Sequence, residues 1–160
     1  IYMVFGFYLT ALFALVGFPN VISLRIGFTV NILPFADMAA DFKNACLNIL
    51  LFVPFGFFLP ILWDRFRKIE NAAVMGLLTS LCIELSQIFT LRTTDINDLI
   101  TNTIGTIIGY LIARWITGKF TRQILLHTKI SDFYMICGTV AVIMFFFQPF
   151  ISLWLWEMVL

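Results

Sequence analysis

Long runs without a charged residue limit what this 160-residue chain can fold into. Residues 44–63 form such a run of 20 residues, residues 133–156 form one of 24, and residues 1–24 carry no charge before Arg25. An α-helix needs about 20 mostly apolar residues to cross the hydrocarbon core of a bilayer. Repeated runs of this length therefore predict a protein that is embedded in a membrane.

The composition agrees with a membrane protein and argues against other classes. Apolar residues make up 61% of the chain and charged residues 12%, whereas soluble domains contain about 45–50% and 25%. A net charge of +1 without a long basic run argues against nucleic-acid binding. One histidine and three cysteines without C-x-x-C spacing give no reason to expect a metal or cofactor site.

Five transmembrane helices are expected, in one domain that covers residues 1–160. Two further runs reach the required length when charged residues are admitted, because Glu84 lies inside one and Asp98 and Arg114 lie near the ends of the other. The predicted fold class is therefore an all-α integral membrane helical bundle. Its predicted spans are residues 1–18, 44–63, 71–91, 97–115 and 133–156.

The sequence changes its period between the first two spans. From Ile22 to Ile32, apolar residues alternate strictly with polar residues or glycine over 11 positions, which is typical of a half-buried strand. A lone strand is not stable inside lipid. We expect a short extended segment, or a hairpin about Gly27, on the outer face, and an irregular loop is the alternative.

The distribution of basic residues predicts the orientation. Seven Lys and Arg residues flank the spans on the side of the connectors 64–70 and 114–131, and three lie on the other side. Because cytoplasmic loops carry the excess of Lys and Arg, the first side is expected in the cytoplasm. The N-terminus of the chain would then be cytoplasmic and the C-terminus outside the cell membrane.

Polar residues inside the predicted spans fall at one depth, near the outer ends. Glu84 lies seven residues before Leu91, which places it about 10 Å deep at 1.5 Å per residue. An acidic residue inside a span costs about 2.5–3.5 kcal/mol unless it is paired or hydrated, so it is a functional candidate by default. The residues that reach this layer, from three spans and one connection, are Asn48, Glu84, Gln87, Arg92, Asp95, Asp98 and Asn102.

The chemistry of these residues suggests two groups of roles. Glu84 is a candidate general acid or base, with Asp98 and Arg92 as catalytic candidates that polarise or position a substrate. Purely structural interpretations stay open, because Asp95 could cap the fourth helix with Asp98 in its first turn. Amide side chains could likewise only join helices. The candidate substrate-binding residues are Asn48, Gln87, Asp95 and Asn102.

Small residues and prolines predict how two of the spans behave. Gly105 and Gly109 form a G-x-x-x-G motif, which allows a neighbouring helix to approach closely. Pro54 and Gly56 are expected to interrupt the second span. Backbone groups exposed at that interruption would join the polar layer.

The order and spacing of these motifs resemble the VanZ-like family. The resemblance implies a small multi-pass membrane protein of bacteria, linked to low-level teicoplanin resistance without alteration of the D-alanyl peptidoglycan terminus. It assigns no chemical role to any single residue. The matching stretches are residues 31–35, 48–56, 83–87, 92–98 and 102–105, followed by Gly109.

Three functional hypotheses follow, and whether the chain is an enzyme stays open among them. In the first, it modifies or handles an envelope lipid or a lipid-linked precursor through an outer-leaflet polar site around Glu84. The alternative is a non-catalytic membrane module that binds a lipid, the lipoglycopeptide or a partner membrane protein. A metal-dependent hydrolase with Glu84, Asp95 and Asp98 as oxygen ligands is the weakest, because it would have no histidine ligand. The oligomeric state is not predicted.

Overall fold

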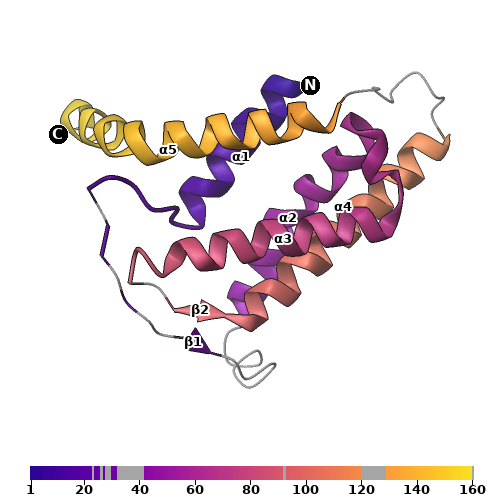
Figure 1. Cartoon of the computed structure of the whole chain (residues 1–160), viewed down its shortest axis with the longest axis horizontal. Coiled ribbons are helices and arrows are strands. Elements are labelled where there is room, and N and C mark those ends of the chain that lie inside the picture. Colours follow the sequence, from indigo (N-terminus) through magenta and orange to yellow (C-terminus); the bar gives the residue numbers. More distant parts are fainter. Residues whose placement is uncertain are drawn as a thin grey trace.

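Five α-helices make up most of the computed structural model (Figure 1), which describes residues 1–22, 24, 25, 27, 30, 31, 42–91, 93–119 and 129–159. A 3₁₀ turn, η1 (Asp64–Arg67), joins the second helix to the third, and two short strands, β1 (Val30–Asn31) and β2 (Thr94–Asp95), pair near the start of the fourth. The predicted all-α bundle is confirmed. Its helices are α1 (Tyr2–Leu15), α2 (Phe42–Leu62), α3 (Ile69–Gln87), α4 (Ile96–Lys119) and α5 (Ile130–Val159).

Four of these helices are long and apolar enough to cross a membrane. They are α2, α3, the part of α4 at Ile96–Gly118 and the part of α5 at Ile130–Phe150. The chain is therefore a multi-pass membrane protein. Helix α1 has 14 residues, about 21 Å at 1.5 Å per residue, against a hydrocarbon core of about 30 Å. That α1 is a fifth span stays a prediction.

Helices α2 and α3 pack tightly against α4 at Thr106. A Cβ atom on Gly56 of α2 would collide with the backbone carbonyl of Thr106, and one on Gly76 of α3 would collide with its side chain. The predicted G-x-x-x-G motif continues this contact, because Gly105 and Gly109 lie against the backbone of α2. Glycine thus lets α2 and α3 approach α4 at places where a side chain on either of them would hold the helices apart.

The expected interruption at Pro54 and Gly56 is wrong. Helix α2 is continuous from Phe42 to Leu62 and contains both Pro54 and Pro60. A proline inside a helix removes one N–H donor, and such residues are tolerated in membrane helices where neighbours compensate. Gly56 serves the contact with α4 instead of breaking the helix.

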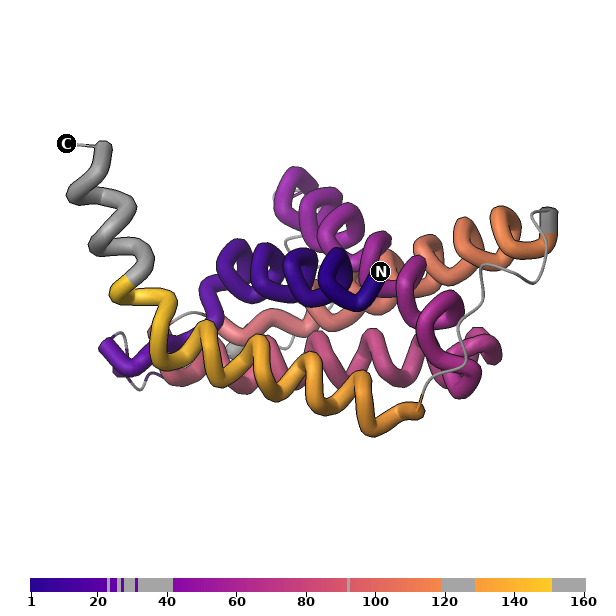
Figure 2. The backbone as a smooth tube through the Cα atoms, turned by 90° about the horizontal axis from the view of Figure 1, so that it is seen from above, coloured from indigo at the N-terminus to yellow at the C-terminus, as the bar shows by residue number. Residues whose placement is uncertain are grey.

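An aromatic cluster joins α1 and α5 to the end of α2 and to η1. The indole of Trp63 meets the ring of Phe133 edge-on at 5.1 Å between centroids and the ring of Phe5 at 5.3 Å. Phe55 and Phe66 complete the cluster, and all five side chains are buried. Figure 2 shows α1 and α5 on one side of the molecule, and α5 packs chiefly on α1.

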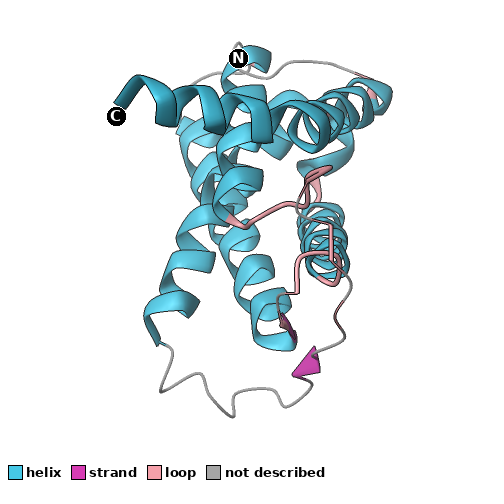
Figure 3. Cartoon of the chain, turned by 90° about the vertical axis from the view of Figure 1, so that its left-hand side faces the viewer, coloured by secondary structure: helices cyan, strands magenta, loops and turns pink. Residues whose placement is uncertain are grey.

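The two strands lie together at the opposite end of the helices (Figure 3). Val30 and Asn31 pair in parallel with Thr94 and Asp95, and the N–H of Gly27 donates to the Ile88 carbonyl at 3.0 Å. The described residues of this segment are therefore extended along the α3–α4 connection, which is the first of the two predicted forms. We call this end of the bundle the β end, and the other the η1 end.

Helix α3 ends at Gln87, four residues earlier than the predicted span. The chain turns at residues 88–91, where Thr90 N–H donates to the Gln87 carbonyl at 2.9 Å. Leu91 then adopts a positive φ of 58°, a conformation that is uncommon for a residue with a side chain. This turn directs the following residues toward β1 and the start of α4.

Replacing Gly109 tests the helix packing. Gly109→Ala should lower the thermal unfolding midpoint of the detergent-purified protein, because overpacking a tight contact costs about 1–3 kcal/mol. Gly138→Ala in α5 is the control, since no described atom lies within 4 Å of the place where its Cβ would be. Alanine favours helix over glycine, so the control midpoint should hold or rise. Equal midpoints in the two variants would contradict this packing.

Candidate functional site

The contact at Thr106 determines which polar residues of α2, α3 and α4 lie at the same height along the bundle. Eight residues toward the β end from Gly56, Gly76 and Thr106 lie Asn48, Glu84 and Asp98 respectively (56 to 48, 76 to 84, 106 to 98). This corresponds to about 12 Å along each helix axis. The side-chain amide of Asn48 donates a hydrogen bond to Oδ1 of Asp98 at 2.7 Å. The structure thus joins two of the predicted site residues directly.

Ser80 lies four residues after Gly76, and Asn102 lies four residues before Thr106. These two side chains form the next polar contact toward the β end. The Asn102 amide nitrogen donates to the Ser80 hydroxyl at 2.9 Å, and both side chains are buried. Within the described residues, the Asn102 amide oxygen has no hydrogen-bond partner. Asn102 therefore links α3 to α4 inside the bundle rather than lining an open site.

Glu84 is buried, and its hydrogen bonds hold the backbone of β2. The side chain is 1% exposed, and its Oε2 accepts a hydrogen bond from the backbone N–H of Asp95 at 2.9 Å. The Glu84 carbonyl also accepts from the Thr94 hydroxyl at 3.1 Å. Both bonds reach β2, so the position of β2 relative to α3 depends on Glu84.

Asp95 starts α4 and also receives a contact from β1. Its Oδ1 accepts the backbone N–H of Asn97 at 2.8 Å, which is the helix cap that the sequence suggested. Its Oδ2 accepts the side-chain amide of Asn31 at 3.1 Å. Asp98 follows in the first turn of α4, where a carboxylate interacts favourably with the helix dipole.

A cavity of about 410 Å³ opens beside these residues at the β end. Its wall combines two carboxylates and two amides with leucines from α1 and α2. A cavity with such a wall can accommodate a ligand that has both a polar and an apolar part. We call it the polar cavity, and its lining residues are Leu15, Asn44, Leu47, Asn48, Leu51, Thr93, Asp95 and Asp98.

Three other predicted site residues lie outside the described lining of this cavity. Gln87 is buried and donates its side-chain amide to the Val16 carbonyl at 3.2 Å, so it ties α3 to the end of α1. Glu84 and Asn102 are absent from the described lining of the polar cavity. Arg92 lies outside the described residues, and its catalytic role stays a prediction.

Two polar residues that line the cavity, Asn44 and Thr93, are not among the predicted site residues. Asn44 lies one helical turn before Asn48, a spacing that places the two amides on the same face of α2. That spacing was the available signal for Asn44. Thr93 belongs to the short connection before β2 and gives no periodic signal of its own.

The polar cavity presents acceptors more than donors among its described residues. Two carboxylates and two amide side chains line it, and Asn48 holds Asp98 in place. These groups can bind hydroxyl or ammonium groups of a ligand, and a carboxylate can accept a proton from one. In the part of the chain that the structure describes, no three His, Cys, Asp or Glu side chains gather as metal ligands would.

Comparisons with known proteins cover the helices that build this cavity. Protein VanZ of Enterococcus faecium is 34% identical to the chain over 82 residues, which are 51% of this chain and 50% of that protein. The chain thus spans about half the length of the curated relative it matches. No solved structure matches the chain. The model of the VanZ/LLP1 family matches residues 2–117, from α1 almost to the end of α4, and the chain therefore belongs to the VanZ/LLP1 family.

Proposed function

We propose that the chain binds and handles an envelope lipid or a lipid-linked precursor in the polar cavity, and that this activity links it to teicoplanin resistance. The observation that carries the proposal is the mixed wall of the cavity, which combines Asp95 and Asp98 with Leu15, Leu47 and Leu51. A lipid headgroup with its first apolar carbons has matching chemistry. Membership in the VanZ/LLP1 family supports the link to resistance.

Asp98 is the proposed contact for the polar end of the ligand. Its carboxylate lines the cavity and is oriented by the amide of Asn48. Hydrogen bonds to an ionised acceptor are about twice as strong as neutral ones, so Asp98 would bind hydroxyl or ammonium donors of the headgroup. If the ligand is chemically changed, Asp98 is the carboxylate positioned to accept its proton.

Glu84 is proposed as a positioning residue. Its carboxylate accepts the Asp95 N–H and therefore acts on the ligand through β2 and the start of α4. This arrangement also suits the non-catalytic alternative, in which the polar cavity only recognises a lipid, the lipoglycopeptide or a partner membrane protein. Turnover of a lipid by the purified protein would separate handling with chemistry from recognition alone.

The β end is proposed to face the outside of the cell. The connectors at the η1 end carry the excess of Lys and Arg, seven against three at the other end, as cytoplasmic loops do. The polar cavity would then open at the depth of the outer leaflet. Lipid-linked envelope precursors and an externally added lipoglycopeptide could both reach it there.

Neutralising Asp98 tests the proposed contact. Asp98→Asn keeps the shape of the side chain and an acceptor for Asn48, but it removes the negative charge. We expect teicoplanin susceptibility to return while membrane abundance stays normal. Asp132→Asn is the matched control, because Asp132 lies in the first turn of α5, away from the cavity. Full resistance with Asp98→Asn at normal abundance would refute the proposed contact.

Two substitutions of Glu84 separate position from charge. Glu84→Gln retains an oxygen that accepts the Asp95 N–H, and it lowers the cost of burying a carboxylate, so abundance should be normal. Our prediction is that it abolishes the resistance phenotype, because the β2 backbone loses a charge-assisted bond. Glu84→Ala leaves the Asp95 N–H without this acceptor, at a cost of about 1–3 kcal/mol, and abundance should fall.

The readouts for these variants are membrane abundance, thermal stability and teicoplanin susceptibility. Normal abundance with lost resistance in Glu84→Gln supports a functional role for the carboxylate. Resistance that falls only in proportion to abundance would instead show that Glu84 merely holds the fold. Wild-type behaviour of Glu84→Gln in all three measurements would rule out both roles.

Thiol labelling tests the orientation. In a variant without Cys46, Cys82 and Cys137, a single cysteine is placed either at Thr93 or at Lys68, which are exposed at opposite ends of the bundle. In intact cells, an impermeant maleimide should label the cysteine at position 93 and leave the one at position 68 unlabelled. Permeabilised cells, in which both should react, provide the control. The reverse pattern would overturn the proposed orientation.

A further inference from the structure

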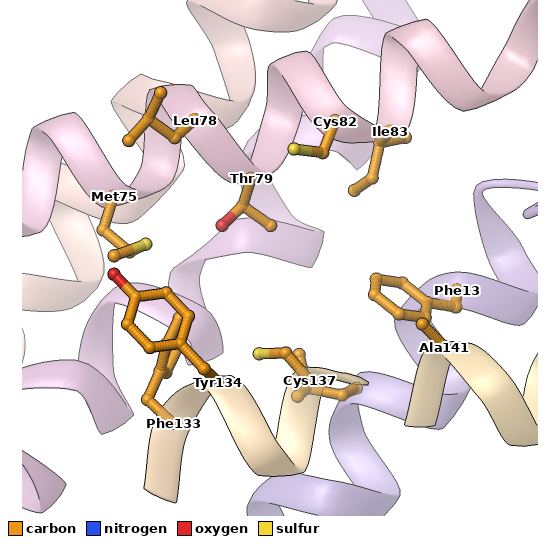
Figure 4. A pocket seen from close by; sticks show the side chains of 11 residues that line it. Phe13, Met75, Leu78, Thr79, Cys82, Ile83, Phe133, Tyr134, Cys137 and Ala141 are labelled. Atoms are coloured by element: carbon orange, nitrogen blue, oxygen red, sulfur yellow. The ribbon is translucent and has the colours of Figure 1, made fainter. Parts of the chain in front are cut away.

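A second cavity lies between α3 and α5, with α1 as its floor (Figure 4). Its volume is about 450 Å³, and carbon and sulfur atoms dominate its wall. Figure 4 shows Cys82 of α3 and Cys137 of α5 directed toward the space, with Met75 and Tyr134 near one end. We call it the apolar cavity. It exists because α5 packs chiefly on α1 and not along α3.

The apolar cavity has a buried floor and an exposed rim. Leu9 on α1 and Ile83 on α3 are 1% and 3% exposed, whereas Leu78 on α3 and Tyr134 on α5 are 47% and 59% exposed. The exposed apolar surface continues from the rim along both helices, both of which include a membrane-spanning stretch. Members of this continuing surface are Leu81 and Leu85 of α3 and Val142 of α5.

We infer that the apolar cavity holds one hydrocarbon chain of a membrane lipid. The rim is continuous with the lipid-facing surface of two spans, so lipid chains are the molecules at its mouth. Water does not fill an apolar cavity, and an empty one forfeits the dispersion contacts of its lining atoms. A volume of about 450 Å³ is within the range of about 300–1,000 Å³ that small-molecule sites occupy.

This site is separate from the polar cavity and does not depend on the proposed function. Helix α1 lines both, with Leu9 and Phe13 at the apolar cavity and Leu15 at the polar one. Helix α5, which forms one wall, lies beyond residues 2–117 that the family model matches. The apolar cavity is therefore built partly by a helix that lies outside the region matched by the family model.

The hydrocarbon chain of the lipid, and not its headgroup, should determine binding at the apolar cavity. The described wall offers few polar atoms besides the hydroxyls of Thr79 and Tyr134 and the two thiols. Phosphatidylcholine and phosphatidylglycerol with the same palmitoyl and oleoyl chains should therefore bind equally. A preference for one headgroup would indicate a different, polar site.

Filling the cavity with a larger side chain tests the inference. Ala141 lines the apolar cavity, so Ala141→Phe should occupy the space of the lipid chain. Val142→Phe is the matched control, because Val142 is the next residue, is 55% exposed and does not belong to the lining. Thermal unfolding in the same detergent establishes that both variants fold.

Native mass spectrometry of the detergent-solubilised protein, titrated with each phospholipid, provides the measurement. We expect the wild-type protein and Val142→Phe to retain a lipid equally well with either headgroup. In Ala141→Phe, the lipid-bound fraction should fall several-fold. Equal retention by all three proteins would overturn the inference. So would a lipid-free dimer that Ala141→Phe alone disrupts, because a second copy of the chain would then fill the cavity.

Discussion

Helices α2, α3 and α4 meet at Thr106, and the polar site depends on this contact. Gly56 of α2 lies against the Thr106 carbonyl and Gly76 of α3 lies against the Thr106 side chain, so the helices cannot slide past one another without a collision. The register that results places Asn48, Glu84 and Asp98 at one level, two helical turns away. Small residues near the middle of these helices thereby align polar residues nearer the β end.

The burial of Glu84 has a structural explanation in the bond to Asp95. A carboxylate inside a span is costly unless polar partners replace water, and the Asp95 N–H is one such partner. Asp95 in turn caps α4 and accepts a bond from Asn31 of β1. A single chain of contacts therefore connects the interior of α3 with the segment between α1 and α2.

Simple counting along the sequence predicts the helical bundle, because helices of this kind depend on local length and hydrophobicity. The cap at Asp95 and the close approach at Gly105 and Gly109 are local in the same way. The direction of the Gln87 side chain, in contrast, cannot be predicted from the local sequence. It shares a helix face with Glu84, yet it bonds to Val16 of α1, and only the tertiary position of α1 decides this.

The same limit explains the wrong prediction for α2 and the unpredicted partner of β1. The sequence around Pro54 carries a helix-breaking signal, but the packing of Gly56 against α4 requires a continuous helix there. The alternation at residues 22–32 indicates an extended segment without naming its partner. That partner is the α3–α4 connection, which lies more than 60 residues further along the chain.

The pairing of α1 with α5 has a consequence for how the protein is assembled. Among the described helices, α1 has its most extensive contacts with α5, although more than 110 residues separate the end of one from the start of the other. At a synthesis rate of about 5–20 residues per second, α1 waits several seconds for this partner. During that time α2, α3 and α4 can already pack through their glycines, and α1 has only its contacts with α2 and α3 until α5 leaves the ribosome.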